Sequence, residues 1–508
     1  MEIELTRTQL ACYDTVLDTT VLHEETMEMI VSDACPDILR IVDTAGTVCL
    51  KSKEAMEGRA EVTGAVRCAI LYLPDGEKGV RRIEANIPFS CTADCAGISP
   101  ACSVVAAPRV LCADTRVLNP RKVLVRVNLA VDFRVFCPAT ASLCTGAECA
   151  APNNSVEQLT ERHKTYMVTC VQEKPFTFSD DLSIPGSRPE AAELLKCRAS
   201  LNCTESKIIG NKLIFKGEAA LRICYRAVDD TVCTVDFELP FSQIMEVSGV
   251  GEEADCSLNV LLTELSCTLG AGDGRTVSVS MGLLAQAVIR EERYIELLTD
   301  IYSTACDLTA EMQSNTFNDL VENNARRQTT REIVETETMA RSAIDASVNL
   351  GAVTQNREGN WVTFSVEAFV SVLYLNEENE IRAVNRRMNV PCQVELPEGC
   401  ACSCRSRGTG EVFATPTAGG IEVRFDLDFR YLALSSKRLA AVTGVQAGEN
   451  IARDGEKEPS IVLRVVGQER LWDIAKTYRT TMADIMQANE LEPGGALEGK
   501  LLLIPRKR

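Results

Sequence analysis

Three stretches of this chain share one pattern and end in tyrosine: VRCAILY at residues 66–72, AALRICY at residues 219–225 and AFVSVLY at residues 368–374. In each stretch apolar residues alternate with other residues, which is typical of a half-buried β-strand. The successive tyrosines are 153 and 149 residues apart. Self-similarity at this period predicts three copies of one domain.

Further anchors flank each tyrosine. A polar turn follows it, and then comes a second strand that contains a proline. These prolines are Pro88, Pro240 and Pro391, and they stand 16, 15 and 17 residues after the tyrosine. Upstream, Pro36 and Pro189 each stand 36 residues before the tyrosine, and Thr338 takes that place in the third copy. A proline followed by an acidic residue favours the first turn of a helix, so a short helical turn is expected at this point.

Each copy also closes with a strand of period 2, at residues 123–129, 276–281 and 421–427. The copies are therefore predicted to be antiparallel β-domains of four to six strands, either sandwiches or twisted sheets. The polar segments 155–173 and 291–340 show no clear period, and they are expected to be irregular, with some helix or an edge strand.

The C-terminal segment reads IVLRVVGQERLWDIAKTYRTTMADIMQANELEPGGALEGKLLLIP over residues 461–505. Its pattern predicts a strand, two helices and a second strand. The segment before it, TGVQAGENIARDGEKEPS, has the composition of a flexible linker. The predicted fold is mostly β: three tandem antiparallel β domains and a small βααβ (α+β) domain. The expected boundaries are 1–145, 146–300, 301–442, 443–460 for the linker and 461–508.

Composition and charge exclude several classes of function. The formal net charge is −19, which opposes binding to the phosphate backbone of a nucleic acid. No apolar run is long enough to span a bilayer, and no secretory signal is visible at the start, so a cytoplasmic protein without direct membrane insertion is expected. The chain has two histidines and no phosphate-binding loop, nucleophile elbow or zinc-protease helix. No enzyme, catalytic residue or cofactor is therefore predicted.

Cysteine is abundant, with 23 residues. In a long cytoplasmic chain most of these are expected to be reduced, buried thiols. Cys400, Cys402 and Cys404 lie at every second position and would share one face of a strand. Three soft ligands could hold zinc or copper(I), although no histidine is near and the spacing is uncommon for zinc. A thiol strand without a ligand is the favoured interpretation, and oxidative cross-linking between chains is a further hypothesis.

The C-terminal segment resembles a LysM module. The resemblance is carried by Leu471, Trp472, Asp473, Ile474, Ala475, Tyr478, Asn489, Gly499, Leu501, Ile504 and Pro505. LysM modules bind ligands and do not make or break bonds. The resemblance therefore implies a binding protein.

The repeats resemble the SPOCS domain of the SipL family of spore-coat morphogenesis proteins. The proline segments, the tyrosine strands and the prolines downstream of them carry this resemblance, together with the order of β repeats and one terminal LysM module. It implies an endospore-forming bacterium and a place in the mother-cell cytoplasm, at the forespore surface. It also implies attachment to the coat ATPase SpoIVA and contacts with other coat proteins.

The loop before Leu471 distinguishes two ligands for the module. Sugar-binding LysM modules typically carry Gly-Asp-Ser/Thr there, whereas this chain has Gln468, Glu469 and Arg470. The glycine that permits close backbone approach is lost, and a long arginine replaces a small hydroxyl. Arg470 could instead pair with a carboxylate on a protein. A protein partner is therefore favoured, and N-acetylglucosamine or peptidoglycan is the alternative.

The predicted contact residues are those of two loops. They are Gln468, Glu469, Arg470, Leu471, Asn489, Glu490, Leu491 and Glu492. Asn489 has a second interpretation as a cap of the second helix. Trp472 is expected in the core of the module, and so, by spacing, are Leu471, Ile474, Ile485, Leu501 and Ile504. The chain is thus predicted to be a non-enzymatic adaptor in coat assembly, with a glycan-binding protein as the alternative.

Overall fold

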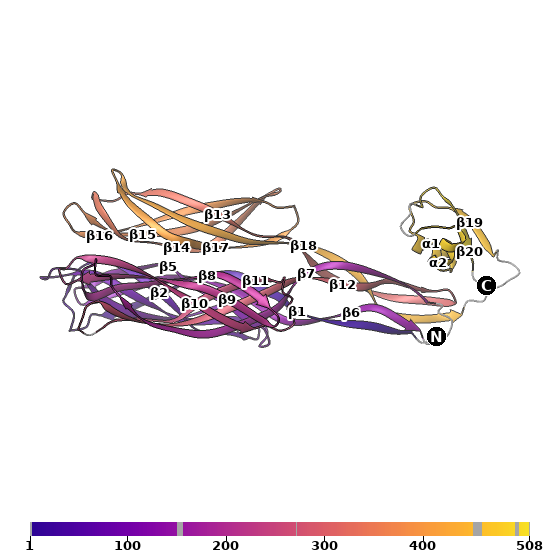
Figure 1. Ribbon diagram of the computed structural model, residues 1–508, viewed down its shortest axis with the longest axis horizontal. Helices are drawn as coiled ribbons and strands as arrows, with labels where there is room; N and C mark the ends of the chain where they lie inside the picture. Colours follow the sequence, from indigo (N-terminus) through magenta and orange to yellow (C-terminus); the bar gives the residue numbers. More distant parts are fainter. Residues whose placement is uncertain (1–2, 150–155, 271, 451–459, 493–496, 507–508) are drawn as a thin grey trace.

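The structure is a computed structural model that describes residues 3–149, 156–270, 272–450, 460–492 and 497–506. It has an elongated body of β-strands, from which paired strands extend toward a small domain at the C-terminal end (Figure 1). The mostly β fold with a short helical module is confirmed. Neither helix of the described residues has the length and apolar character needed to cross a membrane.

The body consists of three units with the same six-strand order. The strands of the first unit are β1 (Ile3–Ile30), β2 (Ile38–Met56), β3 (Arg59–Pro74), β4 (Arg81–Asp94), β5 (Ser103–Asn119) and β6 (Lys122–Cys149). Two antiparallel three-stranded sheets, β2-β3-β4 and β1-β6-β5, enclose one apolar core. Each unit is thus a small sandwich in which the alternating strands bury one side chain in two.

The second unit repeats this arrangement. Its strands are β7 (Val156–Ser183), β8 (Ala191–Ile209), β9 (Lys212–Ala227), β10 (Val232–Glu246), β11 (Asp255–Leu269) and β12 (Thr276–Ser303). The third unit contains β13 (Cys306–Val334), β14 (Ala340–Glu358), β15 (Trp361–Asn376), β16 (Ile381–Glu395), β17 (Ala401–Thr417) and β18 (Gly420–Asn450). A single bridge between Tyr13 in β1 and Val168 in β7 joins the outer sheets of the first two units.

The repeated tyrosine and proline have a structural explanation. Tyr72 and Tyr225 are fully buried, and their phenols donate to the carbonyl oxygens of Pro36 and Pro189, at 3.3 and 3.0 Å. In the third unit the hydroxyl of Thr338 lies 3.4 Å from the phenol of Tyr374. The predicted helical turn at Pro36 and Pro189 does not form, because these residues lie in a loop whose carbonyl is held by the tyrosine.

The polar segments between the repeats are strands, which corrects the prediction of irregular structure. In each unit the first and last strands are 28 residues or longer and pair beyond the sandwich as a two-stranded ribbon. The three ribbons pack on one another through Leu143, Leu297 and Phe317. Polar and apolar residues alternate only weakly along these strands, because their inner side faces the other ribbons and not the core of a sandwich.

The units lie around an approximate threefold axis. Asp43, Lys196 and Asp345 each stand 29 residues before the tyrosine of their repeat, and the three side chains meet in the interior. The ammonium nitrogen of Lys196 lies 3.0 Å from Asp43 and 2.7 Å from Asp345. The residues one position earlier, Val42, Leu195 and Ile344, join one apolar cluster.

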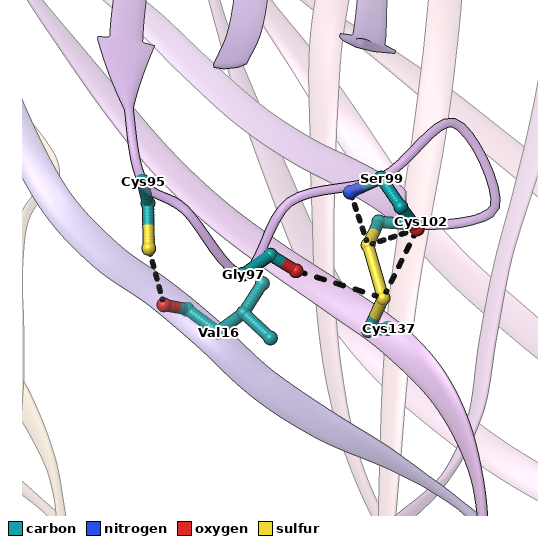
Figure 2. Close-up of a disulfide and its surroundings, with 6 residues drawn as sticks. All are labelled: Val16, Cys95, Gly97, Ser99, Cys102 and Cys137. Atoms are coloured by element: carbon teal, nitrogen blue, oxygen red, sulfur yellow. Dashed lines mark hydrogen bonds between the residues drawn. A yellow bond between two sulfur atoms is a disulfide. The ribbon is translucent and has the colours of Figure 1, made fainter. Parts of the chain in front are cut away.

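One disulfide ties the first unit together. Cys102, in the loop before β5, is bonded to Cys137 of β6, and Ser99 contacts both sulfur atoms (Figure 2). The nearby Cys95 stays a free thiol that donates to the carbonyl of Val16 in β1. In all, 21 cysteines, Cys95 included, are free thiols, so the expectation of mostly reduced cysteine fits all but the bonded pair.

The C-terminal module has the predicted order of strand, two helices and strand. It comprises β19 (Ile461–Val465), α1 (Leu471–Tyr478), α2 (Met482–Ala488) and β20 (Leu501–Pro505). The predicted flexible linker is wrong for residues 443–450, which continue β18 and pair with β13. Residues 451–459 of that linker lie outside the described part of the chain.

Candidate functional site: the C-terminal module and its docking

The module is built around a small apolar core. Trp472, Ile474 and Ile485 of the helices and Leu502 and Ile504 of β20 are buried in it. The short helices need this packing, because seven or eight residues are too few for an isolated helix to be stable in water. Thr481 caps α2 by accepting the backbone N–H of Asp484 at 3.0 Å.

The module is docked on the ends of the ribbons, through α1. The indole nitrogen of Trp472 donates to Asp300 of β12 at 2.7 Å, and its ring lies edge-on to Tyr302 with the centroids 4.8 Å apart. Tyr302 in turn donates to the carbonyl oxygen of Thr480 at 2.7 Å. Burial raises the pKa of the Tyr302 phenol, so it remains a donor at neutral pH.

Ion pairs surround this contact. Asp300 accepts from the ammonium group of Lys476 at 2.7 Å, and Asp307 of β13 pairs with Arg479 at 2.6 Å. Trp472 is 2% exposed and is buried as predicted, although part of its cover comes from the second unit. The module is therefore positioned relative to the body, and α1 faces the ribbons.

The first predicted contact loop is on the surface. Gln468, Glu469 and Arg470 are all exposed. Arg470 is the N-cap residue of α1 but caps nothing with its side chain. Its guanidinium bonds both carboxylate oxygens of Asp473, at 3.1 and 3.2 Å, and this hydrogen bond lowers the pKa of Asp473. The arginine thus replaces a capping hydroxyl by a charged group that is held at the surface.

The second loop divides into structural and exposed residues. The side-chain amide of Asn489 donates to the carbonyls of Ile485 and Leu503 and accepts from the N–H of Leu503, at 2.6–2.7 Å. Its side chain is therefore engaged within the module, as in the capping interpretation. Glu490 and Glu492 are exposed.

The two predicted leucines of these loops, Leu471 and Leu491, are partly buried against the module core. They offer a partner only part of their surface. Of the predicted contact residues, only five polar ones are therefore exposed. These are Gln468, Glu469, Arg470, Glu490 and Glu492.

An apolar strip on the module was missed by the sequence reasoning. Ile461, Leu463 and Val465 of β19 are 54–63% exposed, and Leu501 of β20 is 60% exposed. The predicted core position of Leu501 is wrong, because the register of β20 buries Leu502 instead. The sequence did contain a signal for this strip: β20 is an unbroken apolar run, so both of its faces are apolar and only one can be buried.

This strip lies on the side of the sheet away from the helices. Leu463 pairs with Leu503 and Val465 pairs with Leu501, so the exposed side chains of both strands share one face. Since α1 faces the ribbons, the strip is left to the solvent. Exposed apolar side chains gathered on one face are a feature of interaction sites.

The thiols of Cys400, Cys402 and Cys404 pack against the core of the third unit. Cys400 donates to the carbonyl of Pro397 at 3.0 Å, and Cys400 and Cys404 are 8% exposed. Burial raises the pKa of Cys404 to about 12, which disfavours the thiolate that a metal would need. No group of three or more histidine, cysteine, aspartate or glutamate side chains with metal-binding geometry occurs among the described residues.

Comparisons with known families agree with this architecture. The SPOCS domain of the SipL family matches residues 37–117 and 190–269, and the LysM domain matches residues 468–505. The two SPOCS matches begin at the proline segments of the first and second units. No curated protein and no solved structure matches the chain. The chain therefore contains two segments that match the SPOCS domain of the SipL family and a C-terminal segment that matches the LysM domain.

Proposed function

We propose that this coat-associated adaptor attaches coat material to the forespore surface in the mother cell by docking its LysM module on the coat ATPase SpoIVA. The β units then act as a spacer and as a surface for other coat proteins. One module gives modest affinity, but a polymerised partner offers many neighbouring sites, so that avidity strengthens attachment. The proposed role requires no catalysis, in keeping with two families of non-catalytic domains.

The observation that carries the proposal is the surface that the module leaves open. It combines the apolar strip of Ile461, Leu463, Val465 and Leu501 with the exposed charged residues Glu469 and Arg470. An apolar centre with a charged rim is the usual composition of a protein–protein interface. The docked α1 holds this surface at the far end of the ribbons, away from the body (Figure 1).

Binding of N-acetylglucosamine or peptidoglycan is the alternative, because the LysM family includes glycan-binding modules. Arg470 argues against it, since its side chain stands at the N-cap of α1 and is paired with Asp473 where the sugar loop needs small residues. Titration of the full chain with chitin oligomers tests this alternative. Saturable binding to the module would favour the glycan function.

A capture experiment with purified SpoIVA tests the proposal. The full chain should capture the ATPase, and a chain that ends at Ser460 should not. Leu463→Ser and Arg470→Glu should each weaken capture about tenfold, because a central interface residue contributes about 1–2 kcal/mol. Leu463 is 63% exposed, so its replacement should leave folding intact.

Two matched substitutions serve as controls. Leu118→Ser changes an exposed leucine of the first unit, and Arg438→Glu reverses an exposed arginine of the third unit. Both variants should capture the ATPase normally. Capture that survives removal of the module would place the docking site on the β units and contradict the proposal.

A further inference from the structure

A cavity of about 410 Å³ lies where the three units meet, at the base of the ribbons. Its walls come from all three units, including β6, β12, β17 and β18. Six arginines and three aspartates line it, and no lysine or glutamate does. The lining therefore carries a net charge of +3, in a chain whose net charge is −19.

The three aspartates are already engaged. Asp132 is bonded to Arg109 at 2.6 Å and also to the hydroxyl of Thr20. Asp18 pairs with Arg405. The third, Asp255, accepts the phenol of Tyr166 at 2.8 Å and pairs with no arginine among the described residues.

The remaining arginines form no direct ion pair, although aspartates of the lining lie near Arg134 and Arg290. No carboxylate of the described residues lies within salt-bridge distance of Arg134, Arg290, Arg407 or Arg430, each of which lines the cavity. Arg134 belongs to the first unit, Arg290 to the second, and the other two to the third. The guanidinium of Arg407 donates to the carbonyl of Leu201, but in the described part of the chain the guanidinium groups of Arg134 and Arg290 have no hydrogen-bond partner.

This arrangement costs free energy when the cavity holds only water. Burial, together with the neighbouring Arg405 and Arg290, lowers the pKa of Arg134 to about 10. Burial also lowers the pKa values of Arg290 and Arg407. Guanidinium groups bind phosphate and carboxylate oxygens in pairs of parallel hydrogen bonds, so one anion could relieve the repulsion among several of them.

We propose that this cavity binds a small multivalent oxyanion, whose phosphate or carboxylate groups are held by Arg134, Arg290 and Arg407 from the three units. Access is through a second cavity of about 880 Å³ that shares Asp18, Tyr166 and Arg290 with the first and continues between the ribbons. A bound anion would link the three units and stabilise their arrangement.

Thermal unfolding of the full chain tests the site, with sodium pyrophosphate and sodium citrate as probes and sodium chloride at matched ionic strength as the reference. At least one probe should raise Tm by about 3 °C or more beyond chloride. Isothermal titration should show saturable binding of that probe. A response to pyrophosphate alone assigns phosphate chemistry, and a response to citrate alone assigns carboxylate chemistry.

Substitutions separate a binding role from a structural one. Arg134→Gln and Arg290→Gln should each weaken binding about tenfold or more, because each removes a charge-assisted contact. They should also leave Tm in chloride unchanged or raised, since they relieve repulsion. Arg116→Gln, at an exposed position outside the cavity, should behave as the wild type.

Two results would overturn the proposal. One is an equal effect of pyrophosphate, citrate and chloride on Tm, with no heat of binding for either probe. The other is a fall in Tm in chloride for Arg134→Gln and Arg290→Gln with the response to the probes unchanged, which would make these arginines structural.

Discussion

The phenol of each repeat tyrosine contacts the loop between the first and second strands of its unit. Tyr225 is fully buried, and its hydroxyl holds the carbonyl of Pro189, which has no other backbone partner in the described residues. The constant separation of 36 residues follows from this contact, because the strands between proline and tyrosine have the same length in every unit. Spacing alone locates the pair, but it does not show that a hydrogen bond joins them.

Replacing Tyr225 by phenylalanine should destabilise the protein by about 1–2 kcal/mol. The substitution keeps the ring but leaves a partly buried carbonyl without its donor. Chemical denaturation of the full chain measures the effect. Tyr294→Phe is the control, because Tyr294 is 60% exposed, and its loss of a hydroxyl should change little. Equal effects of the two substitutions would contradict the role of the contact.

The buried triad on the axis makes a second residue-scale prediction. Lys196 is the cation that pairs with Asp43, so Lys196→Met should destabilise the protein by about 3–5 kcal/mol. In this variant Asp345 still has an ion-pair partner in Arg198, at 3.5 Å. The double variant Lys196→Met with Asp43→Asn should recover part of the loss, since it removes the unpaired charge. No recovery in denaturation experiments would show that packing, not charge, makes Lys196 necessary.

The triad also sets a pH window. Burial alone lowers the pKa of Lys196, but Asp43 and Asp345 raise it above its ordinary value. Its contribution is therefore present at neutral pH and lost as the pH rises through the raised pKa. Burial alone would raise the pKa of Asp345, but Lys196 and Arg198 lower it. That contribution is present above about pH 4 and lost as the pH falls through the lowered pKa.

In the Lys196→Met variant the free energy of unfolding should change in the opposite direction to that of the wild type when the pH is lowered from 7 to 5. Without Lys196, Asp345 loses the largest of the charges that lower its pKa, so acidification should stabilise this variant and not the wild type. Denaturation at both pH values measures the difference. Parallel pH profiles would contradict the buried charge pair.

At the scale of elements, the ribbons explain where sequence reasoning stopped. The strands of each sandwich alternate clearly and were predictable, because one face meets a core. The outer half of β13 has no such contrast: Leu308 and Ala310 pack against the other ribbons, but Met312 and Ser314, beyond a register shift, are exposed. Its strand structure depends on pairing with β18, more than a hundred residues away, and no local pattern encodes that pairing.

The docked module gives a prediction at the same scale. In a chain that carries Trp361→Phe, fluorescence reports Trp472 alone. Asp300→Ala should release α1 from the ribbon, since it removes the partner of both the indole nitrogen and Lys476, and the emission should shift to the red. Asp307→Ala removes only the pair with Arg479 and should shift it less. An unchanged spectrum after Asp300→Ala would mean that packing alone holds the module.

Across the whole molecule, the sequence indicated the number and order of domains but not how they assemble. The third repeat lacks the upstream proline, yet its unit has the same six strands, because Thr338 supplies the contact to Tyr374. The resemblance to LysM modules was enough to assign the proposed contact residues to two loops of the module. The exposed strip could not be predicted, because the exposure of Leu501 depends on the pairing register of β20 with β19. A shift of one residue would turn the other face of β20 outward, and the composition of the strand does not distinguish the two registers.

The cysteines allow a prediction for the intact chain. Alkylation of unfolded, unreduced protein should modify 21 thiols, and prior reduction should raise this to 23. Mass spectrometry counts the groups, and peptide mapping should assign the protected pair to Cys102 and Cys137. Cys95→Ser should not change the protected pair. Modification of all 23 thiols without reductant would contradict the bond.

The buried charges where the three units meet bear on why the units belong to one polypeptide and not to three identical subunits. In a complex of three identical subunits, a side chain on the symmetry axis must meet two copies of itself, so an aspartate there would face only aspartates. Joining the copies into one polypeptide removes that restriction, and a lysine stands between two aspartates instead. The same loss of symmetry gives the assembly a single C-terminal module in place of three.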